Sequence, residues 1–298
     1  MRRSSRTRST RVLRWSFLLV TALWSTPAFA QCDVSGEWSA RSREDWEDRA
    51  QLGTNLGDYT GFPINDRARQ YGYTWDASIL SLPTQQGIPH PGQYFMRGPG
   101  PNFRMSKLED RDTSEVVGYT LVGMWGRADR VIWTDGREPP PEYVEYTWSG
   151  FSTGRCERGM FVVDTTHFKF GYHRRNGVPA SIESKTTEYF IVREDHLTHV
   201  QFTEDPVYLT EPLIRTTDFM RNPNQNVGPR GLGFEVVDEI AVWDAGYVPS
   251  FPLGTVQDDF ANHLGLPLEA TQGGAETIYP EYLPRLRRLM AEMEARDE

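Results

Sequence analysis

The sequence predicts an all-β protein: an antiparallel β-barrel, preceded by a helix and a long loop and followed by a C-terminal helix. From residue 115 onward, short runs rich in Val, Ile, Tyr, Phe and Thr are separated by turn residues, which is the pattern of consecutive antiparallel strands. No helical segments alternate with these runs, which argues against a parallel sheet. A barrel and a sandwich both fit the pattern.

The main β region is expected to span residues 115–243. Its predicted strands are residues 115–125, 130–134, 143–148, 160–170, 184–193, 197–204 and 235–243, and its turns are residues 135–136, 157–159, 175–177 and 193–195. Ahead of this region, Gly36-x-Trp38 resembles the opening signature of lipocalin-like barrels, which favours a barrel over a sandwich. A soluble barrel of about eight strands leaves room for one small ligand.

Residues 31–114 are expected to form an elaboration on the N-terminal side of the barrel. They begin with a polar, irregular stretch over residues 32–60, and a helix is predicted within residues 63–80. The start signal and the helical repeat of this segment come from Pro63, Asn65, Ala68, Tyr71 and Trp75.

Residues 82–104 are rich in Pro and Gly and are predicted to form a long loop, which is commonly a lid or a binding loop. Residues 244–298 are expected to contain a further loop and a charged helix over residues 280–296. No Ser/Gly linker, charge block or internal repeat divides the sequence, so residues 31–298 are predicted to be a single domain.

Residues 1–30 have the three parts of a cleavable secretory signal. Six arginines and no acid precede a short apolar run, and Ala28-Phe29-Ala30 places small residues at the positions that signal peptidase reads. Cleavage between Ala30 and Gln31 predicts a periplasmic or secreted protein. A lipid anchor on Cys32 is not expected, because Gln31 precedes it where Gly, Ala or Ser is required.

The charge balance bears on the kind of partner. The chain has 32 basic and 41 acidic residues and a formal net charge of −9. Loss of the six arginines in residues 1–30 would bring this charge to −15. Because so acidic a surface repels phosphate backbones and anionic lipids, we expect neither nucleic acid nor a membrane as a partner. A small molecule, aromatic or hydrophobic, is the remaining class of partner that a barrel interior accommodates.

The two cysteines, Cys32 and Cys156, are expected to form a disulfide. In an oxidising compartment two thiols usually pair. A bridge that closes so long a loop would stabilise the fold by about 4 kcal/mol. The alternative is two separate buried thiols.

Much of the chain resembles a family of exported bacterial proteins that are mostly uncharacterised. The matching residues are Asp135-Gly136-Arg137, Thr147-Trp148-Ser149-Gly150-Phe151-Ser152-Thr153-Gly154, Phe161-Val162-Val163-Asp164-Thr165-Thr166, Arg175-Asn176-Gly177, Asp205-Pro206 and Leu209-Thr210-Glu211-Pro212, with Pro89-His90-Pro91 and Arg97-Gly98 upstream. The resemblance implies a lipocalin-like barrel and cofactor-free cleavage of ether bonds in lignin-derived, phenylcoumaran-type aromatic dimers.

The sequence departs from the family pattern at two places. Residues 156–159 read Cys-Glu-Arg-Gly, where the family has Trp-Glu-Gly-Asp. Glu138-Pro139 stands where the family has His-Pro, so no catalytic role is carried over to that position.

Ether cleavage of this kind needs a base that removes a proton and an acid that protonates the departing oxygen. His167 is the first candidate for the base, because it lies in the densest part of the resemblance and follows a strand face expected to point inward. A core histidine bonded to a backbone carbonyl is the alternative. Glu188 is the second candidate, with Arg175 as a partner if it instead forms a structural ion pair. Tyr172 or Arg175 would assist the oxygen.

Five further residues are candidates for substrate binding. His90, Tyr94 and Arg97 lie in the Pro/Gly loop, and Tyr119 and Trp148 are aromatic residues of predicted strands. Most strand aromatics belong to a core, so only some of them would line a pocket.

Two other patterns predict little. Residues 150–154 match the G-x-S-x-G motif of serine hydrolases, but a strand rather than a helix follows, so we expect a turn with a solvated Ser152. His196 and His199 are three residues apart, which puts them on opposite faces of a strand, so they are expected at the surface near a turn. No residues cluster at ligand spacing, so neither a metal nor a cofactor is expected.

The sequence thus predicts a periplasmic, cofactor-independent lyase that cleaves a small aromatic ether by acid–base chemistry. Two alternatives remain open. One is a non-catalytic lipocalin-type protein that binds a hydrophobic ligand, and the other is a serine hydrolase that uses Ser152.

Overall fold

The computed structural model describes residues 32–43, 56–75, 89–97, 102–123, 129–225, 227 and 254–297. The predicted secretory signal and the predicted strand over residues 235–243 lie outside these ranges. Within them, no helix combines the length and the apolar composition that crossing a membrane requires.

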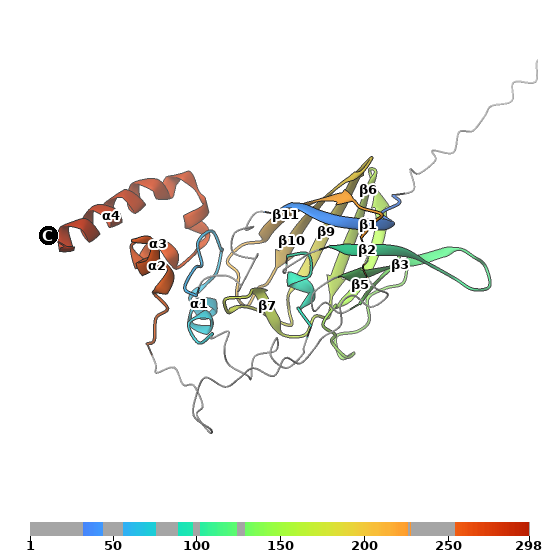
Figure 1. The fold of residues 1–298 in the computed structure, drawn as a ribbon. Coiled ribbons are helices and arrows are strands. Elements are labelled where there is room, and N and C mark those ends of the chain that lie inside the picture. The colour runs from blue at the N-terminus through green and yellow to red at the C-terminus, as the bar shows by residue number, and fades with distance from the viewer. Residues whose placement is uncertain are drawn as a thin grey trace, which may run out of the picture.

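Among the described residues, nine strands close into a barrel (Figure 1), which confirms the predicted lipocalin-like all-β fold. In their order around the barrel they are β1 (Gly36–Arg43), β11 (Leu213–Arg221), β10 (His196–Glu204), β9 (Lys185–Arg193), β6 (Met160–Thr166), β5 (Phe151–Glu157), β4 (Arg130–Trp133), β3 (Val116–Gly123) and β2 (Phe103–Glu109). Neighbouring strands are antiparallel, except that β4 and β5 run parallel. The barrel closes where β1 pairs with β11.

The remaining elements lie outside this sheet. A hairpin of β7 (Gly171–Arg174) and β8 (Val178–Ala180) turns at residues 175–177, as predicted. The helices are α1 (Asp66–Gly72), η3 (Gly92–Tyr94), α2 (Asp259–Leu264), α3 (Leu268–Thr271), η4 (Ala275–Ile278), η5 (Pro280–Tyr282) and α4 (Leu283–Asp297). Helix α4 confirms the predicted C-terminal helix, and Figure 1 shows it extending away from the barrel.

Helix α1 begins where the sequence predicts a helix. Asn65 is the N-cap, and its side-chain oxygen accepts a hydrogen bond of 3.0 Å from the backbone N–H of Ala68. This bond satisfies one of the donors that the first turn of a helix leaves unpaired. The helix ends at Gly72, well before the predicted limit at residue 80.

Four barrel strands were not predicted. Strands β1 and β2 fall at least partly in segments expected to be irregular or a loop, β5 was expected to be a turn, and β11 was not recognised. In β11 the inward residues Arg215 and Thr217 are polar although they are buried. Alternation of apolar with polar residues, the usual signal of a strand, is therefore weak in β11.

Residues 143–148 do not form the predicted strand. Prolines at positions 139–141 precede this segment, and a proline has no N–H to donate to a sheet. Tyr143 is 89% exposed, and only an isolated bridge joins Thr147 to Phe168. Strand β6 stops at Thr166 rather than at the predicted residue 170, because His167 adopts a left-handed φ of 60° that breaks the extended backbone.

The interior of the barrel has an apolar half and a polar half. Along each strand the inward side chains alternate with outward ones. Their sequence from the apolar to the polar half is Phe161, Val163 and Thr165 in β6, Phe190, Glu188 and Thr186 in β9, Leu197, His199, Gln201 and Thr203 in β10, and Phe219, Thr217 and Arg215 in β11, all of them buried. The polar half therefore lies toward the end of the barrel from which the chain leaves to form β7 and β8.

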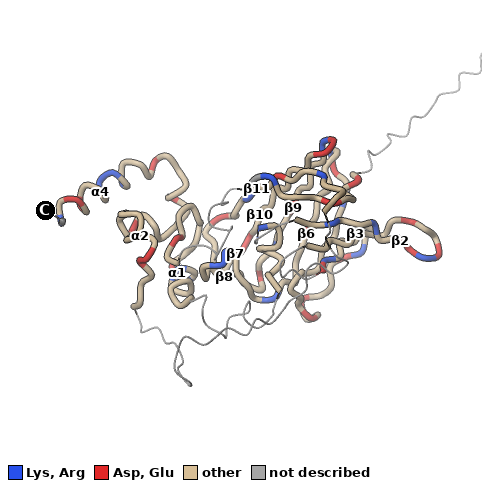
Figure 2. Tube along the Cα trace, viewed as in Figure 1, with Lys and Arg blue, Asp and Glu red and all other residues tan. Residues whose placement is uncertain are grey.

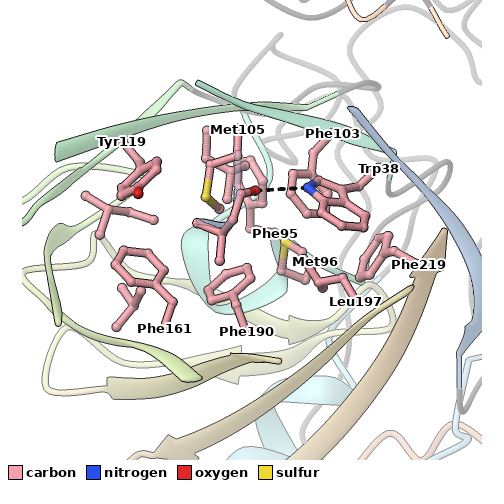
Figure 3. Packing of buried hydrophobic residues seen from close by; sticks show 14 residues of the cluster. Trp38, Phe95, Met96, Phe103, Met105, Tyr119, Phe161, Phe190, Leu197 and Phe219 are labelled. Atoms are coloured by element: carbon pink, nitrogen blue, oxygen red, sulfur yellow. Dashed lines mark hydrogen bonds between the residues drawn. The ribbon is translucent and has the colours of Figure 1, made fainter. Parts of the chain in front are cut away.

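Residues 92–97, predicted to belong to a long lid or binding loop, enter the barrel. Phe95 and Met96 are each 1% exposed and lie in the middle of the apolar cluster in Figure 3, among side chains of the barrel strands. Arg97 is also 1% exposed, and it donates to the backbone oxygen of Thr216 at 2.5 Å and to Oγ1 of Thr217 at 3.1 Å. The chain's own side chains thus occupy the space that a ligand takes in an open barrel.

On the side of the barrel away from α4, the β2–β3 hairpin extends outward (Figure 2). Figure 2 shows acidic and basic residues together at its tip, and residues 110–115 are exposed. Like the rest of the chain's charged surface, this tip contributes to solvation of the fold rather than to its core.

A disulfide joins Cys32 to Cys156, as predicted, with 5.7 Å between the two Cα atoms. It ties the residues before β1 to β5 across a sequence separation of 124 residues. Such a bridge restricts the unfolded chain, so it stabilises the folded one.

We expect a Cys32→Ser/Cys156→Ser double variant to lose about 4 kcal/mol of unfolding free energy, because a loop of this length contributes that much entropy. Chemical denaturation with and without a thiol reductant measures the loss. The reductant should lower the unfolding free energy of the wild-type protein and leave that of the double variant unchanged. A wild-type midpoint that does not respond to reductant would contradict the prediction.

Candidate active site

The polar half of the barrel contains a buried ion pair between Arg130 of β4 and Glu188 of β9. Both side chains are at most 3% exposed. The Nη1 atom of Arg130 donates to Glu188 Oε1 at 3.1 Å, and Nη2 donates to Oε2. On the other side of the carboxylate, His199 Nε2 donates to Oε1 at 3.0 Å. The predicted alternative for Glu188, a structural ion pair, is thus present, but its partner is Arg130 rather than Arg175.

The remaining donor groups of Arg130 are also satisfied. Nε donates to Ser152 Oγ at 2.9 Å, and Nη2 donates to Thr165 Oγ1 at 2.7 Å. Four strands thereby meet at one guanidinium, and β10 joins them through the bond of His199 to Glu188. These bonds satisfy a buried charge in the way that low-dielectric surroundings require. We call Arg130, Ser152, Thr165, Glu188 and His199 the interior network.

Two expectations about this network were wrong. His199 is 1% exposed and lies inside the barrel, not at a surface turn. Ser152 is fully buried within β5, not solvated in a turn. The sequence did contain a signal for His199, because it alternates with Leu197 and Gln201 on one strand face.

The interior network fixes the protonation state of Glu188. Burial raises the pKa of this carboxyl, but the charge of Arg130 and the hydrogen bonds from His199 and Arg130 outweigh burial and hold the pKa at about 2. A carboxylate with so low a pKa is a poor proton acceptor at neutral pH. Geometry therefore favours a structural role for Glu188.

A second polar group lies at the end of the polar half, outside the strands of the barrel. Here Tyr172 of β7 and His90 share a short hydrogen bond between the tyrosine hydroxyl and the imidazole Nδ1. The rings of Tyr94 and Trp75 pack edge-on against Tyr172, with centroids 5.3 Å and 5.7 Å away. We call His90, Tyr94, Tyr172 and Trp75 the aromatic cluster. Three of its four members were predicted as site residues.

Close backbone packing positions the cluster. The N–H of Gly92 donates to the backbone oxygen of Trp148 at 2.7 Å. A Cβ at Gly92 would lie 2.3 Å from the ring of Phe168, so only glycine fits between them. A Cβ at Gly171 would lie 2.5 Å from Pro91 in the same way. The contacts of Gly92 hold the segment of His90 and Tyr94 against Trp148 and Phe168, and the contact of Gly171 holds it against β7.

One polar atom of the aromatic cluster has no protein partner. The indole N–H of Trp75 is buried and has no hydrogen-bond acceptor in the described structure. Trp75 is 7% exposed, and its neighbours His90, Tyr94 and Tyr172 are at most 8% exposed. A buried donor without an acceptor costs roughly 1–3 kcal/mol, so an oxygen atom of a ligand at this place would gain a ready donor.

The residue after Tyr172 anchors β7 from behind. His173 is completely buried, and its Nε2 donates to Asp205 at 3.0 Å. Burial lowers the pKa of His173, more than Asp205 raises it, so the ring is neutral at pH 7. Asp205 also accepts from the backbone N–H and the hydroxyl of Ser181. Tyr172 is therefore held on a rigid strand.

The other predicted site residues lie elsewhere. His167 is 8% exposed, and its ring nitrogens contact Thr166 and the backbone oxygen of Pro141 rather than the cluster. Trp148 lies at the surface under Lys169, and Arg175 lies in the β7–β8 turn. Tyr119 packs against Phe161 in the apolar half. Arg97 is inside the barrel. A role in catalysis or binding for these five residues stays a prediction.

The described residues contain no group of three or more His, Cys, Asp or Glu side chains placed to hold a metal ion. Comparison of the chain with protein-family models, curated proteins and solved structures finds no match. The fold and the two polar groups are therefore the basis for inferring function.

The low pKa of Glu188 makes stability depend on pH. The carboxylate is stabilised in the folded protein, where its pKa is about 2, relative to the ordinary value of 4.5. Its contribution, about 3 kcal/mol, is complete above the ordinary pKa and is lost as pH falls through the folded pKa. We expect the unfolding free energy, measured by urea titration, to decrease steeply below about pH 4.5.

The matched variants isolate this effect. Arg130→Met/Glu188→Gln removes both charges without leaving either one unpaired, so the corresponding part of the acid dependence should disappear. Glu157→Gln changes an exposed carboxylate and should leave the acid dependence of the unfolding free energy unchanged. An unchanged acid dependence in the double variant would rule out Glu188 as its source.

Proposed function

We propose that this protein is a periplasmic, cofactor-independent carbon–oxygen lyase that acts on a small aromatic ether, with the aromatic cluster as its active site. The observation that carries the proposal is the hydrogen bond between His90 and Tyr172 inside an aromatic enclosure. An imidazole and a phenol in contact supply a base and an acid, and the rings of Tyr94 and Trp75 suit an aromatic substrate.

The chemistry balances without a co-reactant. His90 removes a proton from carbon, a carbon–carbon double bond forms, and the carbon–oxygen bond breaks. Tyr172 protonates the departing oxygen. The proton on His90 then returns to the tyrosine oxygen through the hydrogen bond between the two side chains. This scheme requires that Nδ1 of His90 carries hydrogen and donates to Tyr172, which leaves Nε2 as the base.

Two further observations support the proposal. The unpaired indole N–H of Trp75 offers a donor to an oxygen of the substrate. The resemblance of residues 135–219 to the exported family points to the same reaction and to lignin-derived dimers as the substrate class. The secretory pattern of residues 1–30 and the Cys32–Cys156 bridge support the periplasm.

The geometry favours His90 over the earlier candidates for the base. Glu188 is held as an ion-paired carboxylate by Arg130. His167 lies beyond the end of β6 with its ring against Tyr146. His90, in contrast, shares a hydrogen bond with the predicted acid, Tyr172.

The two alternative functions fit the structure less well. A lipocalin-type carrier binds its ligand inside the barrel, where this chain places Phe95, Met96 and Arg97. A serine hydrolase needs an imidazole beside its nucleophile, whereas Ser152 bonds Arg130 and Thr165. Ser152 also lies within a strand rather than in a strand–turn–helix.

We expect His90→Asn and Tyr172→Phe each to lower kcat on a phenylcoumaran-type dimer by about 10²–10⁴-fold, which is the usual contribution of a general acid or base. Product formation is followed by chromatography, and circular dichroism checks the fold. Tyr189→Phe, which removes a hydroxyl on the barrel wall outside the cluster, is the control and should retain full activity. Wild-type rates in both cluster variants would overturn the proposal.

We expect Trp75→Phe to raise KM about fivefold with little change in kcat, because the change keeps an aromatic ring and removes one neutral hydrogen bond worth about 1 kcal/mol. Steady-state kinetics on the same dimer measure both constants. An unchanged KM would show that the indole N–H does not contact the substrate.

A further inference from the structure

A pocket of about 880 Å³ lies on the outer surface of the protein, apart from the aromatic cluster. Four segments form it: the loop before β5, the end of β6 with His167, the connection between β8 and β9, and the connection between β10 and β11. The residues on which the argument rests are Glu142, Tyr146, His167, Ile182 and Glu183. Its volume is within the range of small-molecule sites, about 300–1,000 Å³.

One wall of the pocket is a fixed pair of rings. The ring centroids of Tyr146 and His167 are 5.0 Å apart, with an angle of 37° between the planes. His167 is held by the Thr166 hydroxyl at 2.7 Å, and its Nε2 is 3.3 Å from the backbone oxygen of Pro141. Because contacts within the protein hold this wall, it does not need a ligand to form.

Apolar side chains make the rest of the wall. Leu209 is 8% exposed, and Ile182 is 51% exposed. A ligand with an apolar body would cover Ile182 and remove that surface from water. The pocket therefore suits a molecule that is not polar throughout.

The charge of the pocket selects the sign of the ligand. Glu142 and Glu183 line it and have no ion-pair partner in the part of the chain that the structure describes. Lys185 lies opposite Glu204 in the register of β9 and β10, so it offsets one carboxylate. Asp205 bonds His173 and Ser181, and Glu211 accepts from Tyr279. An anion would be repelled here, and a cation would be attracted.

We propose that this pocket binds a small organic cation of the alkylammonium class. The ammonium group lies over the Tyr146–His167 pair beside Glu142 and Glu183, and the alkyl part covers Ile182. Ring faces attract a cation with about 0.5–2 kcal/mol, and the carboxylates add a long-range attraction that salt screens. The site is separate from the proposed lyase site, so either proposal can fail without the other.

The test compares choline with 3,3-dimethylbutan-1-ol, which has the same shape and no charge. Calorimetric titration at low ionic strength should show saturable binding of choline and binding of the alcohol at least about fivefold weaker, as the loss of the ring–cation attraction implies. Binding of choline should also weaken at 1 M salt. No saturation by choline up to 10 mM, or equal binding of the alcohol, would overturn the proposal.

Variants locate the binding. Glu142→Gln/Glu183→Gln and, separately, Tyr146→Leu should each weaken choline at least about fivefold. These residues are largely exposed or half-buried, so the fold should tolerate the changes. Glu157→Gln removes one charge outside the pocket and should leave affinity unchanged. An equal loss in Glu157→Gln would show that only net charge matters, which contradicts a specific site.

Discussion

The guanidinium of Arg130 lies inside a closed barrel, where a charge without partners would be strongly unfavourable. Its hydrogen bonds reach Ser152 of β5, Thr165 of β6 and Glu188 of β9, and His199 of β10 completes the shell of Glu188. These bonds can form only if all of these strands have the correct register. The interior network therefore specifies the side of the barrel that includes the parallel β4–β5 pair.

The network also explains how the interior divides. In the apolar half, large side chains pack around Phe95 and Met96, which come from the segment that enters the barrel. At the end of the polar half, the same segment places His90 and Tyr94 against Tyr172 of β7. One short stretch of chain thus completes the core with one end and supplies the proposed active site with the other. A change in its packing should affect stability and reaction together.

The sequence was informative where a residue type has one dominant physical use. The cap at Asn65, the turns at residues 157–159, 175–177 and 193–195, and the inward face of β6 follow from local rules, and the structure agrees with them. Strand β11 and His199 could not be found in this way, because their burial depends on partners from distant strands. His90 and Tyr172 were each selected as candidates, but nothing local indicates that residues 82 positions apart share a hydrogen bond.

Glu188 shows that the face of a strand can be predicted from the sequence while the partner of a side chain cannot. Alternation correctly placed it on an inward face, yet its partner came from β4 rather than from the adjacent turn with Arg175. The choice between a reactive carboxylate and a structural one depends on that partner, and hence on the order of the strands around the barrel. Sequence periodicity gives the face of a strand but not its neighbours.

Of the barrel strands, β1 is synthesised first, but it gains its second neighbouring strand last. It pairs with β2 through residues such as Trp38 and Phe103, but its other edge is covered only by β11, near the end of the barrel sequence. Until β11 is made, β1 and β10 present open edges to other molecules. Two chains at high concentration could therefore exchange β11, each closing the barrel of the other, and form an interlocked dimer without any new contact.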